Sequence, residues 1–245
     1  MHPVLFHVRS VTVYSYGFFV ALAVLAGYLL SQRQAKRFGF SKTAVADLFF
    51  LLFVSGVAGA RVFYVLQHFE DYQHQLWKIF LIQEGGLVWY GGFIIAALVG
   101  FGYAFLRKWP LLKLCDFFSP VLALAHGIGR LGCFFNGCCF GRIAKTPFEI
   151  MIPGEEPFHR IPIQLYESGF LLVLSFYLLD RLGKAHREGE IFVRYLVFYS
   201  AARFVLEFFR GDQILVAFLT PPQWTSVLLF AGAIFFLFIL KKKPR

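Results

Sequence analysis

The chain has 245 residues, of which 58% are hydrophobic, 20% are aromatic and only 16% are charged, and its mean hydropathy is +0.65. A water-soluble domain of this length cannot bury so much apolar surface, so the composition excludes a soluble protein and predicts an integral membrane protein. The formal charge of +10 does not indicate a nucleic-acid partner, because the basic residues are scattered between apolar runs and form no stripe with interleaved aromatic residues.

Several apolar runs reach the length of about 17 to 20 residues that a helix needs to cross a bilayer. They cover residues 11–30, 44–66, 87–106, 111–128, 163–179, 191–209 and 224–240. The first run is not expected to be a cleaved signal peptide, because its cationic cluster, Arg33, Lys36 and Arg37, follows the apolar run and no small-residue cleavage site is evident. The sequence therefore predicts an all-α, polytopic membrane protein with about seven transmembrane helices.

Basic residues are concentrated in the loops that follow predicted spans one, three, five and seven, which hold 14 of the 24 Lys and Arg residues. Because cytoplasmic loops carry the excess of Lys and Arg, this pattern places the N-terminus outside and the C-terminus in the cytoplasm. Two longer loops, 67–86 and 130–162, are then on the outer face. The prolines of the second loop predict turns rather than a soluble domain, so residues 1–245 are expected to form a single integral membrane domain.

The stretch 126–142 is unusually rich in glycine and cysteine. It reads His-Gly-Ile-Gly-Arg-Leu-Gly-Cys-Phe-Phe-Asn-Gly-Cys-Cys-Phe-Gly-Arg and holds five of the 22 glycines and three of the four cysteines. Glycine lets the backbone approach a ligand closely, and an arginine among exposed amides binds phosphate or carboxylate. We interpret the stretch as a polar site at the outer end of a membrane helix. The alternative is a glycine-rich loop with buried thiols and an arginine that snorkels to the surface.

Charged residues also fall inside or at the edges of the predicted spans, where insertion of each charge costs about 2.5–3.5 kcal/mol. They are Arg61, Arg130, Glu167, Arg194, Arg203 and Glu207. Arg203 and Glu207 are four residues apart, so they share a helix face and are expected to pair. We expect Arg61, Arg130 and Arg203 to converge near the outer leaflet, where guanidinium groups bind phosphate oxygens in a bidentate manner. This predicts an anionic phospholipid headgroup as the ligand.

Several short motifs follow one another along the chain. They are Ser15-Tyr16-Gly17; Gly85-Gly86-Leu87 with Trp89-Tyr90-Gly91-Gly92; Gly129-Arg130-Leu131-Gly132 with Phe134, Asn136 and Gly141; Gln164-Leu165-Tyr166-Glu167; and Arg203-Phe204-Val205-Leu206-Glu207-Phe208-Phe209-Arg210. In order and spacing, nearly the whole chain resembles the prolipoprotein diacylglyceryl transferase family. The resemblance implies a multi-pass enzyme of the bacterial inner membrane that transfers a diacylglyceryl group from phosphatidylglycerol to the lipobox cysteine thiol of a prolipoprotein, forming a thioether. The implied partners are membrane lipids and prolipoprotein signal peptides, with no cofactor and no nucleic acid.

The resemblance also implies site residues. By motif position the family's functional residues fall on Tyr16, Arg130, Asn136, Gly141, Arg203 and Glu207, with Arg210 as a further candidate. We expect Arg130 and Arg203 to stabilise the leaving phosphate and Glu207 to position Arg203 or act on the thiol. If the helix continues, His126 lies one turn from Arg130 and is a candidate proton acceptor. The expected catalytic set is thus Arg130, Arg203, Glu207, Tyr16 and His126, and the expected substrate-binding set is Arg61, Tyr90, Asn136, Gly141 and Arg210.

The chain departs from the family's most familiar pattern at four positions. Cys133 replaces an asparagine, Cys138 replaces a glutamate, Tyr90 replaces a histidine, and Ile161 replaces the histidine of a His-Pro pair before Gln-Leu-Tyr-Glu. Three roles stay open for Cys133, Cys138 and Cys139: Cys133 as a nucleophile, a disulfide between Cys133 and one of the others, or simple filling of buried space. A zinc ion would need a fourth ligand, such as His126, and the C-x4-C-C spacing is unlike structural zinc sites, so no metal is predicted.

Two other functions remain open at this point. One is a divergent homologue that moves a lipid group to another acceptor. The other is a non-enzymatic membrane protein that binds or transports an anionic lipid, although no pair of interrupted spans repeats in the two halves as in many transporters. Transfer to a lipobox peptide distinguishes among these functions.

Overall fold

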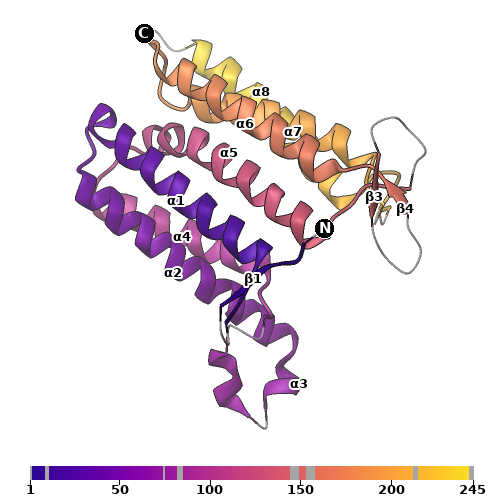
Figure 1. Cartoon of the computed structure of the whole chain (residues 1–245). Helices are drawn as coiled ribbons and strands as arrows, with labels where there is room; N and C mark the ends of the chain where they lie inside the picture. The colour runs from indigo at the N-terminus through magenta and orange to yellow at the C-terminus, as the bar shows by residue number, and fades with distance from the viewer. Residues whose placement is uncertain are drawn as a thin grey trace. The chain divides into compact units, whose positions relative to one another are not determined.

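The computed structural model describes residues 2–8, 11–73, 75–81, 85–143, 149–152, 158–211 and 215–242. Within these residues the fold is mostly helical (Figure 1). The long helices are α1 (Ser15–Ala35), α2 (Lys42–Gln67), α4 (Trp89–Leu106), α5 (Leu111–Asn136), α6 (Ile163–Leu182), α7 (Glu190–Glu207) and α8 (Pro221–Lys242). Shorter elements are η1 (Lys36–Phe38), α3 (Phe69–Tyr72), η2 (Leu76–Phe80) and two antiparallel hairpins, β1 (Val4–Val8) with β2 (Val11–Tyr14) and β3 (Ile150–Ile152) with β4 (Phe158–Arg160).

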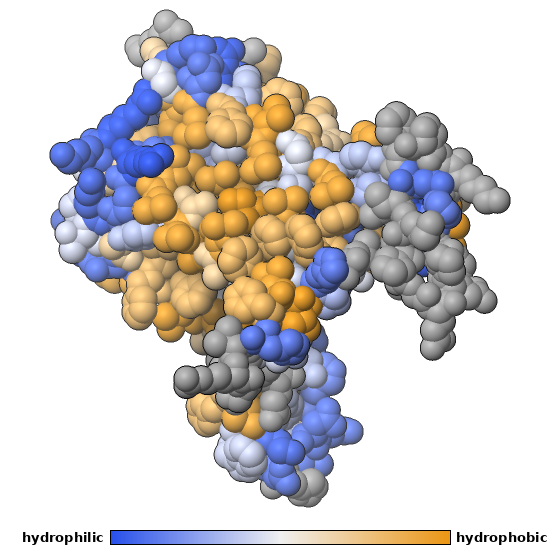
Figure 2. Space-filling model, in the orientation of Figure 1, coloured by the Kyte–Doolittle hydropathy of each residue, from blue (hydrophilic) through white to orange (hydrophobic). Residues whose placement is uncertain are grey.

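Among the described residues, six helices are long and apolar enough to cross a membrane: α1, α2, α4, α5, α6 and α8. Hydrophobic residues cover the visible sides of the helices, and hydrophilic residues gather at helix ends (Figure 2). Helix α7 is as long as α4 but carries Glu190, Arg194, Arg203 and Glu207 within its 18 residues. The protein is therefore a mostly helical, multi-pass membrane protein, and the seventh span stays a prediction.

Two predicted helix boundaries were wrong. The first span was expected to begin at residue 11, but α1 begins at Ser15, and Val11–Tyr14 pairs with Val4–Val8 instead. The residues of Val11–Tyr14 are all β-branched or aromatic, and such residues favour the extended conformation when a neighbouring strand is available for pairing. The fourth span was expected to end at residue 128, but α5 continues to Asn136, so most of the glycine-rich stretch is helical rather than a loop.

Tertiary packing explains why this glycine-rich segment stays helical. A Cβ atom added to Gly127 would lie 3.2 Å from the Leu172 side chain, and one added to Gly132 would lie 2.9 Å from Phe19. The small residues therefore let α5 approach α6 and α1 closely. The helix ends at Asn136. The next residue, Gly137, has a φ of 81°, which is accessible to glycine at little cost, and its N–H donates to the Cys133 carbonyl at 3.1 Å.

The chain divides into two compact units, Met1–Ser31 with Cys115–Arg245 and Gln32–Leu114. In the second unit, α2 packs along α4, and a Cβ atom added to Gly59 would lie only 2.7 Å from the Gly91 carbonyl oxygen. Small residues at such crossings are typical of membrane helices, because close backbone approach increases van der Waals contact.

In the first unit, α6, α7 and α8 lie side by side (Figure 1). Helix α5 is joined to α6 by two buried hydroxyl groups: Ser168 donates to the Gly127 carbonyl and Ser175 to the Pro120 carbonyl, both at 2.8 Å. The acceptor of the second bond is the carbonyl of Pro120 itself, the proline inside α5. This helix group carries the candidate site.

Candidate functional site

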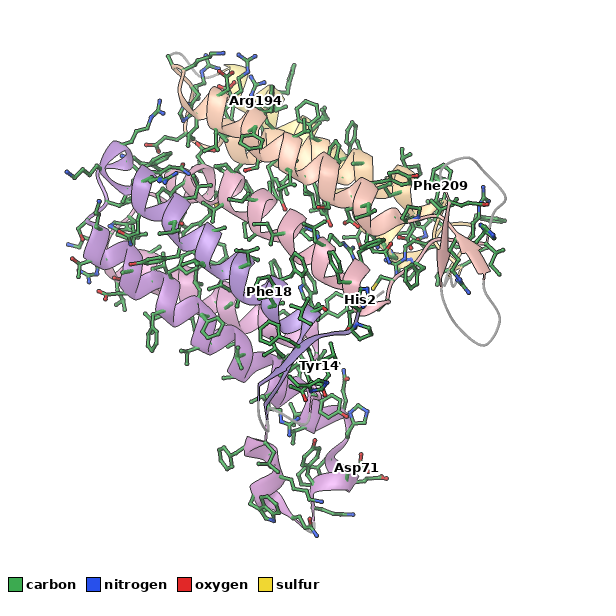
Figure 3. The ribbon with its side chains drawn as sticks, viewed as in Figure 1. His2, Tyr14, Phe18, Asp71, Arg194 and Phe209 are labelled. Carbon is green, nitrogen blue, oxygen red and sulfur yellow. The ribbon has the colours of Figure 1, made fainter. Side chains whose placement is uncertain are left out.

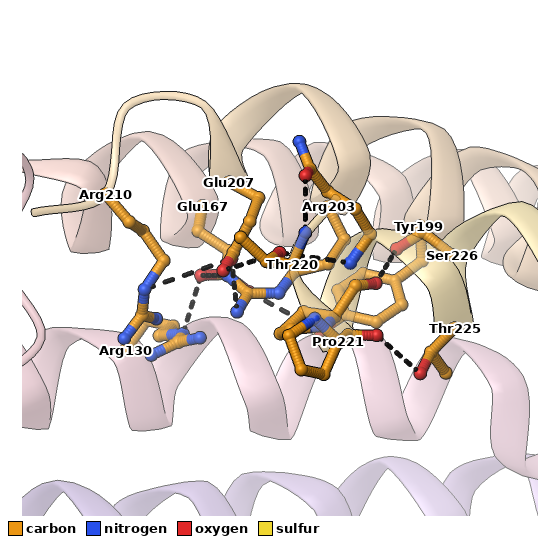
Figure 4. A network of polar contacts seen from close by, with 12 residues as sticks. Arg130, Glu167, Tyr199, Arg203, Glu207, Arg210, Thr220, Pro221, Thr225 and Ser226 are labelled. Atoms are coloured by element: carbon orange, nitrogen blue, oxygen red, sulfur yellow. Dashed lines mark hydrogen bonds and ion pairs between the residues drawn. The ribbon is translucent and has the colours of Figure 1, made fainter. Parts of the chain in front are cut away.

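A buried network of charged residues joins α5, α6 and α7 (Figure 4). Nε of Arg130 is 2.8 Å from Oε2 of Glu167, and Nη1 of Arg203 is 3.9 Å from the same oxygen. Nη2 of Arg203 is 2.8 Å from Oε2 of Glu207, and Nε of Arg210 is 3.9 Å from that oxygen. Glu167 and Glu207 are 1% and 4% exposed. The predicted pairing of Arg203 with Glu207 is confirmed.

Neutral polar groups complete the surroundings of both carboxylates. The hydroxyl groups of Tyr199 and Thr220 donate to Glu167 at 3.5 Å and to Glu207 at 3.2 Å, respectively. Nε2 of His126 is 3.7 Å from Oε1 of Glu167, and its ring meets the Tyr199 ring edge to face. Because α5 continues past residue 128, His126 lies one helical turn from Arg130, as the sequence led us to expect.

Among the described residues, the network holds three arginines and two carboxylates, and these five groups together carry a positive formal charge. Nη1 of Arg203 is buried and has no hydrogen-bond acceptor among the described residues. A buried donor without an acceptor is destabilising, and a phosphate oxygen is the acceptor that a guanidinium matches best. The arrangement is therefore suited to binding an anion, and in particular a phosphate ester.

Arg194, the other arginine of α7, takes no part in this network. Its Nη2 is 2.6 Å from Glu190, its Nη1 donates to the Tyr177 hydroxyl at 2.9 Å, and it lies at the opposite end of the helix from Phe209 (Figure 3).

Gly141 connects the end of α5 to the segment that carries Arg210. The two residues form an antiparallel β-bridge, and the Gly141 N–H donates to the Ile161 carbonyl at 3.0 Å. A Cβ atom at this position would lie 2.7 Å from that oxygen and 2.8 Å from the Phe209 carbonyl oxygen. The close approach of three backbone segments explains why glycine is needed here.

Three thiols gather where α5 ends. The sulfur atoms of Cys133, Cys138 and Cys139 all lie within 4.8 Å of one another, and all three cysteines are free. Cys139 has a φ of 62°, which is uncommon for a residue with a side chain. The Asn136 side chain hydrogen-bonds Cys138, and the Tyr16 ring lies against Gly132 in the preceding turn of α5.

The thiols after α5 differ in acidity. Hydrogen bonding from the Cys133 thiol, assisted by Cys138 and by the positive charges of Arg130 and Arg210, lowers the pKa of Cys139 to about 5. Burial instead raises the pKa of Cys138. Cys139 is thus the thiol of this pair that is deprotonated at neutral pH.

The structure brings most of the predicted site residues into this unit. Arg130, Arg203, Glu207, Arg210 and His126 belong to the charged network. The same unit holds three further predicted residues. Tyr16 lies against Gly132, Asn136 hydrogen-bonds Cys138, and Gly141 forms the β-bridge with Arg210.

Arg61 and Tyr90 belong to the other compact unit. Arg61 is 5% exposed, and its Nε donates to the Ile79 carbonyl at 2.8 Å. Its Nη1 and Nη2 groups donate to the carbonyls of Gly85, Gly86, Lys78 and Leu81 at 2.6, 3.1, 2.8 and 3.3 Å. Tyr90 is exposed in the first turn of α4, with its ring edge-to-face with Trp89. Convergence of Arg61 with Arg130 and Arg203 stays a prediction.

Sequence reasoning gave no site role to Glu167, Tyr199 or Thr220. The signal for Glu167 was present, because an acidic residue inside an apolar helix is costly unless it is paired or functional. Tyr199 and Thr220 carry no such signal, since neither residue type is unusual in a membrane helix or at its end. Their roles depend on which carboxylate the fold places beside them.

The fold and the network together define a multi-pass membrane protein with a buried, cationic site for an anionic group. The model of the family described as prolipoprotein diacylglyceryl transferase matches residues 3–239. The chain is 32% identical to the phosphatidylglycerol–prolipoprotein diacylglyceryl transferase of Clostridium tetani, over 96% of both chains. It is 31% identical to the enzyme of that name from Pediococcus pentosaceus, over 100% of this chain and 92% of the relative, and 32% identical to that of a Clostridium botulinum strain over the full length of both. The chain belongs to the prolipoprotein diacylglyceryl transferase family.

Proposed function

We infer that this protein transfers the diacylglyceryl group of phosphatidylglycerol to the lipobox cysteine thiol of a prolipoprotein. Full-length relatives that carry the name of this activity support the inference. The observation in the structure that carries it is the buried Nη1 of Arg203, which lacks a hydrogen-bond acceptor among the described residues in a network of positive formal charge.

In this reaction the thiol sulfur attacks the terminal glycerol carbon, the carbon–oxygen bond breaks, and glycerol phosphate leaves with the electron pair. Arg203 and Arg130 would bind the phosphate and stabilise the negative charge that develops on it. Glu207 and Glu167 hold these two guanidinium groups in place. His126 is the proposed proton acceptor for the thiol, since it lies in the same network and has a side chain suited to the task.

The membrane arrangement that fits this reaction has seven spans, with α7 as the sixth of them and the N-terminus outside. A helix that carries charges can cross a bilayer when those charges face the bundle interior, and Arg203 and Glu207 both face the network. We propose one integral membrane domain in the bacterial inner membrane. Its partners are phosphatidylglycerol, surrounding membrane lipids and prolipoprotein signal peptides.

The direct test is transfer of labelled diacylglyceryl from phosphatidylglycerol to a synthetic lipobox peptide by the purified protein, beside a peptide with serine in place of the cysteine. We expect labelling of the cysteine peptide alone. Arg203→Lys keeps the charge but loses the bidentate fork, so the rate should fall by about tenfold or more, which corresponds to one lost charged hydrogen bond. Arg194→Lys, in the same helix but outside the network, is the matched control and should keep its activity.

Other outcomes point to the other functions. Lipid labelling of a different acceptor, without labelling of the lipobox peptide, would indicate a divergent homologue. A folded protein that binds phosphatidylglycerol with no transfer would indicate a binding or transport protein. Wild-type activity in Arg203→Lys would remove bidentate phosphate binding from the mechanism.

A further inference from the structure

The three thiols at the end of α5 form a compact donor set. In the sequence the three cysteines follow the pattern C-x4-C-C, and this spacing alone does not predict a metal site. In the structure the chain turns back at Gly137, so that Cys138 and Cys139 return to Cys133 and all three sulfur atoms lie within 4.8 Å of one another. Thiolate sulfur is the preferred ligand of zinc and other soft metal ions.

The segment that carries the thiols is held from several sides. The Cys138 N–H donates to the Cys133 carbonyl at 3.1 Å, and the Gln164 side chain donates to the Cys138 carbonyl at 2.6 Å. Two residues beyond Cys139, Gly141 bridges to Arg210. Fixed supporting contacts of this kind are what a metal site needs, because they hold the ligands in place before the metal binds.

Among the described residues, the group of possible metal ligands contains these three cysteines and no fourth member. Structural zinc sites have four protein ligands, whereas catalytic sites have three and leave the fourth position to water or substrate. The number of donors therefore favours an open, catalytic site. The surroundings agree, since Arg130 lies one turn before Cys133 on the same helix, and three thiolates with one Zn²⁺ carry a net negative charge that arginine compensates.

We propose that Cys133, Cys138 and Cys139 bind one Zn²⁺ ion whose fourth position accepts the thiol of the lipobox cysteine. This inference rests on the proposed function, because it identifies the site that activates the acceptor of the transfer. It also gives the three cysteines one shared role, in place of a nucleophile, a disulfide or packing.

The chemistry balances without an oxidant or reductant. The lipobox thiol binds Zn²⁺ as a thiolate and gives up its proton to His126, the acceptor proposed above, since a coordinating thiol is deprotonated. The bound sulfur donates an electron pair to the terminal glycerol carbon, and the bond from that carbon to the phosphate oxygen breaks with its electrons on the oxygen. The product thioether is neutral and a weaker ligand than a thiolate, so it leaves the metal and reopens the fourth position.

The first experiment measures zinc by mass spectrometry in the full-length protein purified in detergent, without added metal or chelator. We expect about one zinc per chain in the wild type and in Cys115→Ser, the control that changes the fourth cysteine. Cys133→Ser and Cys139→Ser should each lose zinc by at least tenfold, with helical circular dichroism unchanged. Because a variant could fail to fold, metal-stripped wild-type protein is also reloaded with Co²⁺, which should restore one equivalent and produce a thiolate-to-cobalt charge-transfer band.

The second experiment adds lipobox peptide to the cobalt-loaded protein. The cysteine peptide should intensify the charge-transfer band by about one third, because a fourth thiolate joins three, and the serine peptide should leave it unchanged. An unchanged band with both peptides would refute the open position. Wild-type protein that contains no zinc and takes up no Co²⁺ would refute the metal site. Thiol titration in denaturant would then show whether the cysteines are four free thiols or include a disulfide, and either result leaves the metal site refuted.

These results are separable from those that test the transfer itself. Transfer by a protein that holds no metal would overturn the zinc site and leave the proposed function intact. Zinc binding and a peptide-dependent cobalt spectrum without transfer would support the metal site and refute the proposed transfer.

Discussion

Glu167→Gln removes the charge at the centre of the network and keeps nearly the same side-chain volume. Glu167 is 1% exposed, and its Oε2 is 2.8 Å from Nε of Arg130. This is the only ion pair of Arg130 among the described residues, whereas Arg203 keeps Glu207 at 2.8 Å. Removing one partner of a buried pair leaves an uncompensated charge and costs about 3–5 kcal/mol. We expect the free energy of unfolding to fall by that amount.

The assay is reversible unfolding in mixed detergent micelles, followed by far-UV circular dichroism. Glu70→Gln, at an exposed position of α3, is the control and should stay within about 0.5 kcal/mol of the wild type. In the double variant Glu167→Gln with Arg130→Gln both charges are gone, so its destabilisation should be smaller than the sum of the two single effects by about 0.5–3 kcal/mol. A Glu167→Gln variant as stable as the wild type, or strictly additive effects, would refute this reasoning.

Three further predictions concern single positions. Gly141→Ala should lose about 1–3 kcal/mol of stability and most activity, because its Cβ atom would meet two backbone carbonyls. Gly129→Ala, which has open space around the added Cβ atom, should be tolerated. Equal thermal stability of the two variants would contradict this prediction. Arg61→Lys should speed amide hydrogen exchange in residues 76–81, because lysine cannot replace all of its bonds to carbonyls, and unchanged exchange would assign Arg61 another role. In metal-stripped protein, the iodoacetamide labelling rate of Cys139 should be constant from about pH 6.5 to 8.5, because a pKa of about 5 leaves this thiol deprotonated throughout. The labelling rate of Cys138, whose pKa is raised, should increase with pH over the same range. A parallel increase for both thiols would be evidence against the lowered pKa of Cys139.

Local sequence patterns were sufficient for much of the helical framework. Long apolar runs predict membrane helices because the bilayer sets their length and apolar character, and each predicted span overlaps one long helix. The pairing of Arg203 with Glu207 was predictable for a similar reason, since residues four apart lie on one face of any α-helix. The motif order also identified the family that the comparison with known proteins shows.

Other features depended on partners that are distant in the sequence. Val11–Tyr14 continues an apolar run, but the neighbouring strand Val4–Val8 makes it a strand. The glycines of α5 suggest a loop, yet contacts with Phe19 and Leu172 keep the segment helical to Asn136. Local propensity is a weak preference, and tertiary contacts override it at such places.

The sequence by itself determined that this protein is a membrane enzyme of its family, because apolar composition, span length and motif order are properties of the chain alone. Only the tertiary structure decided that Glu167 of α6 pairs with Arg130 of α5, and that Cys138 and Cys139 return to Cys133. The physical reason is that ion pairs and metal ligands depend on distances of a few ångströms. Those distances are set by how helices pack and where the chain turns, and neither can be calculated from spacing along the sequence.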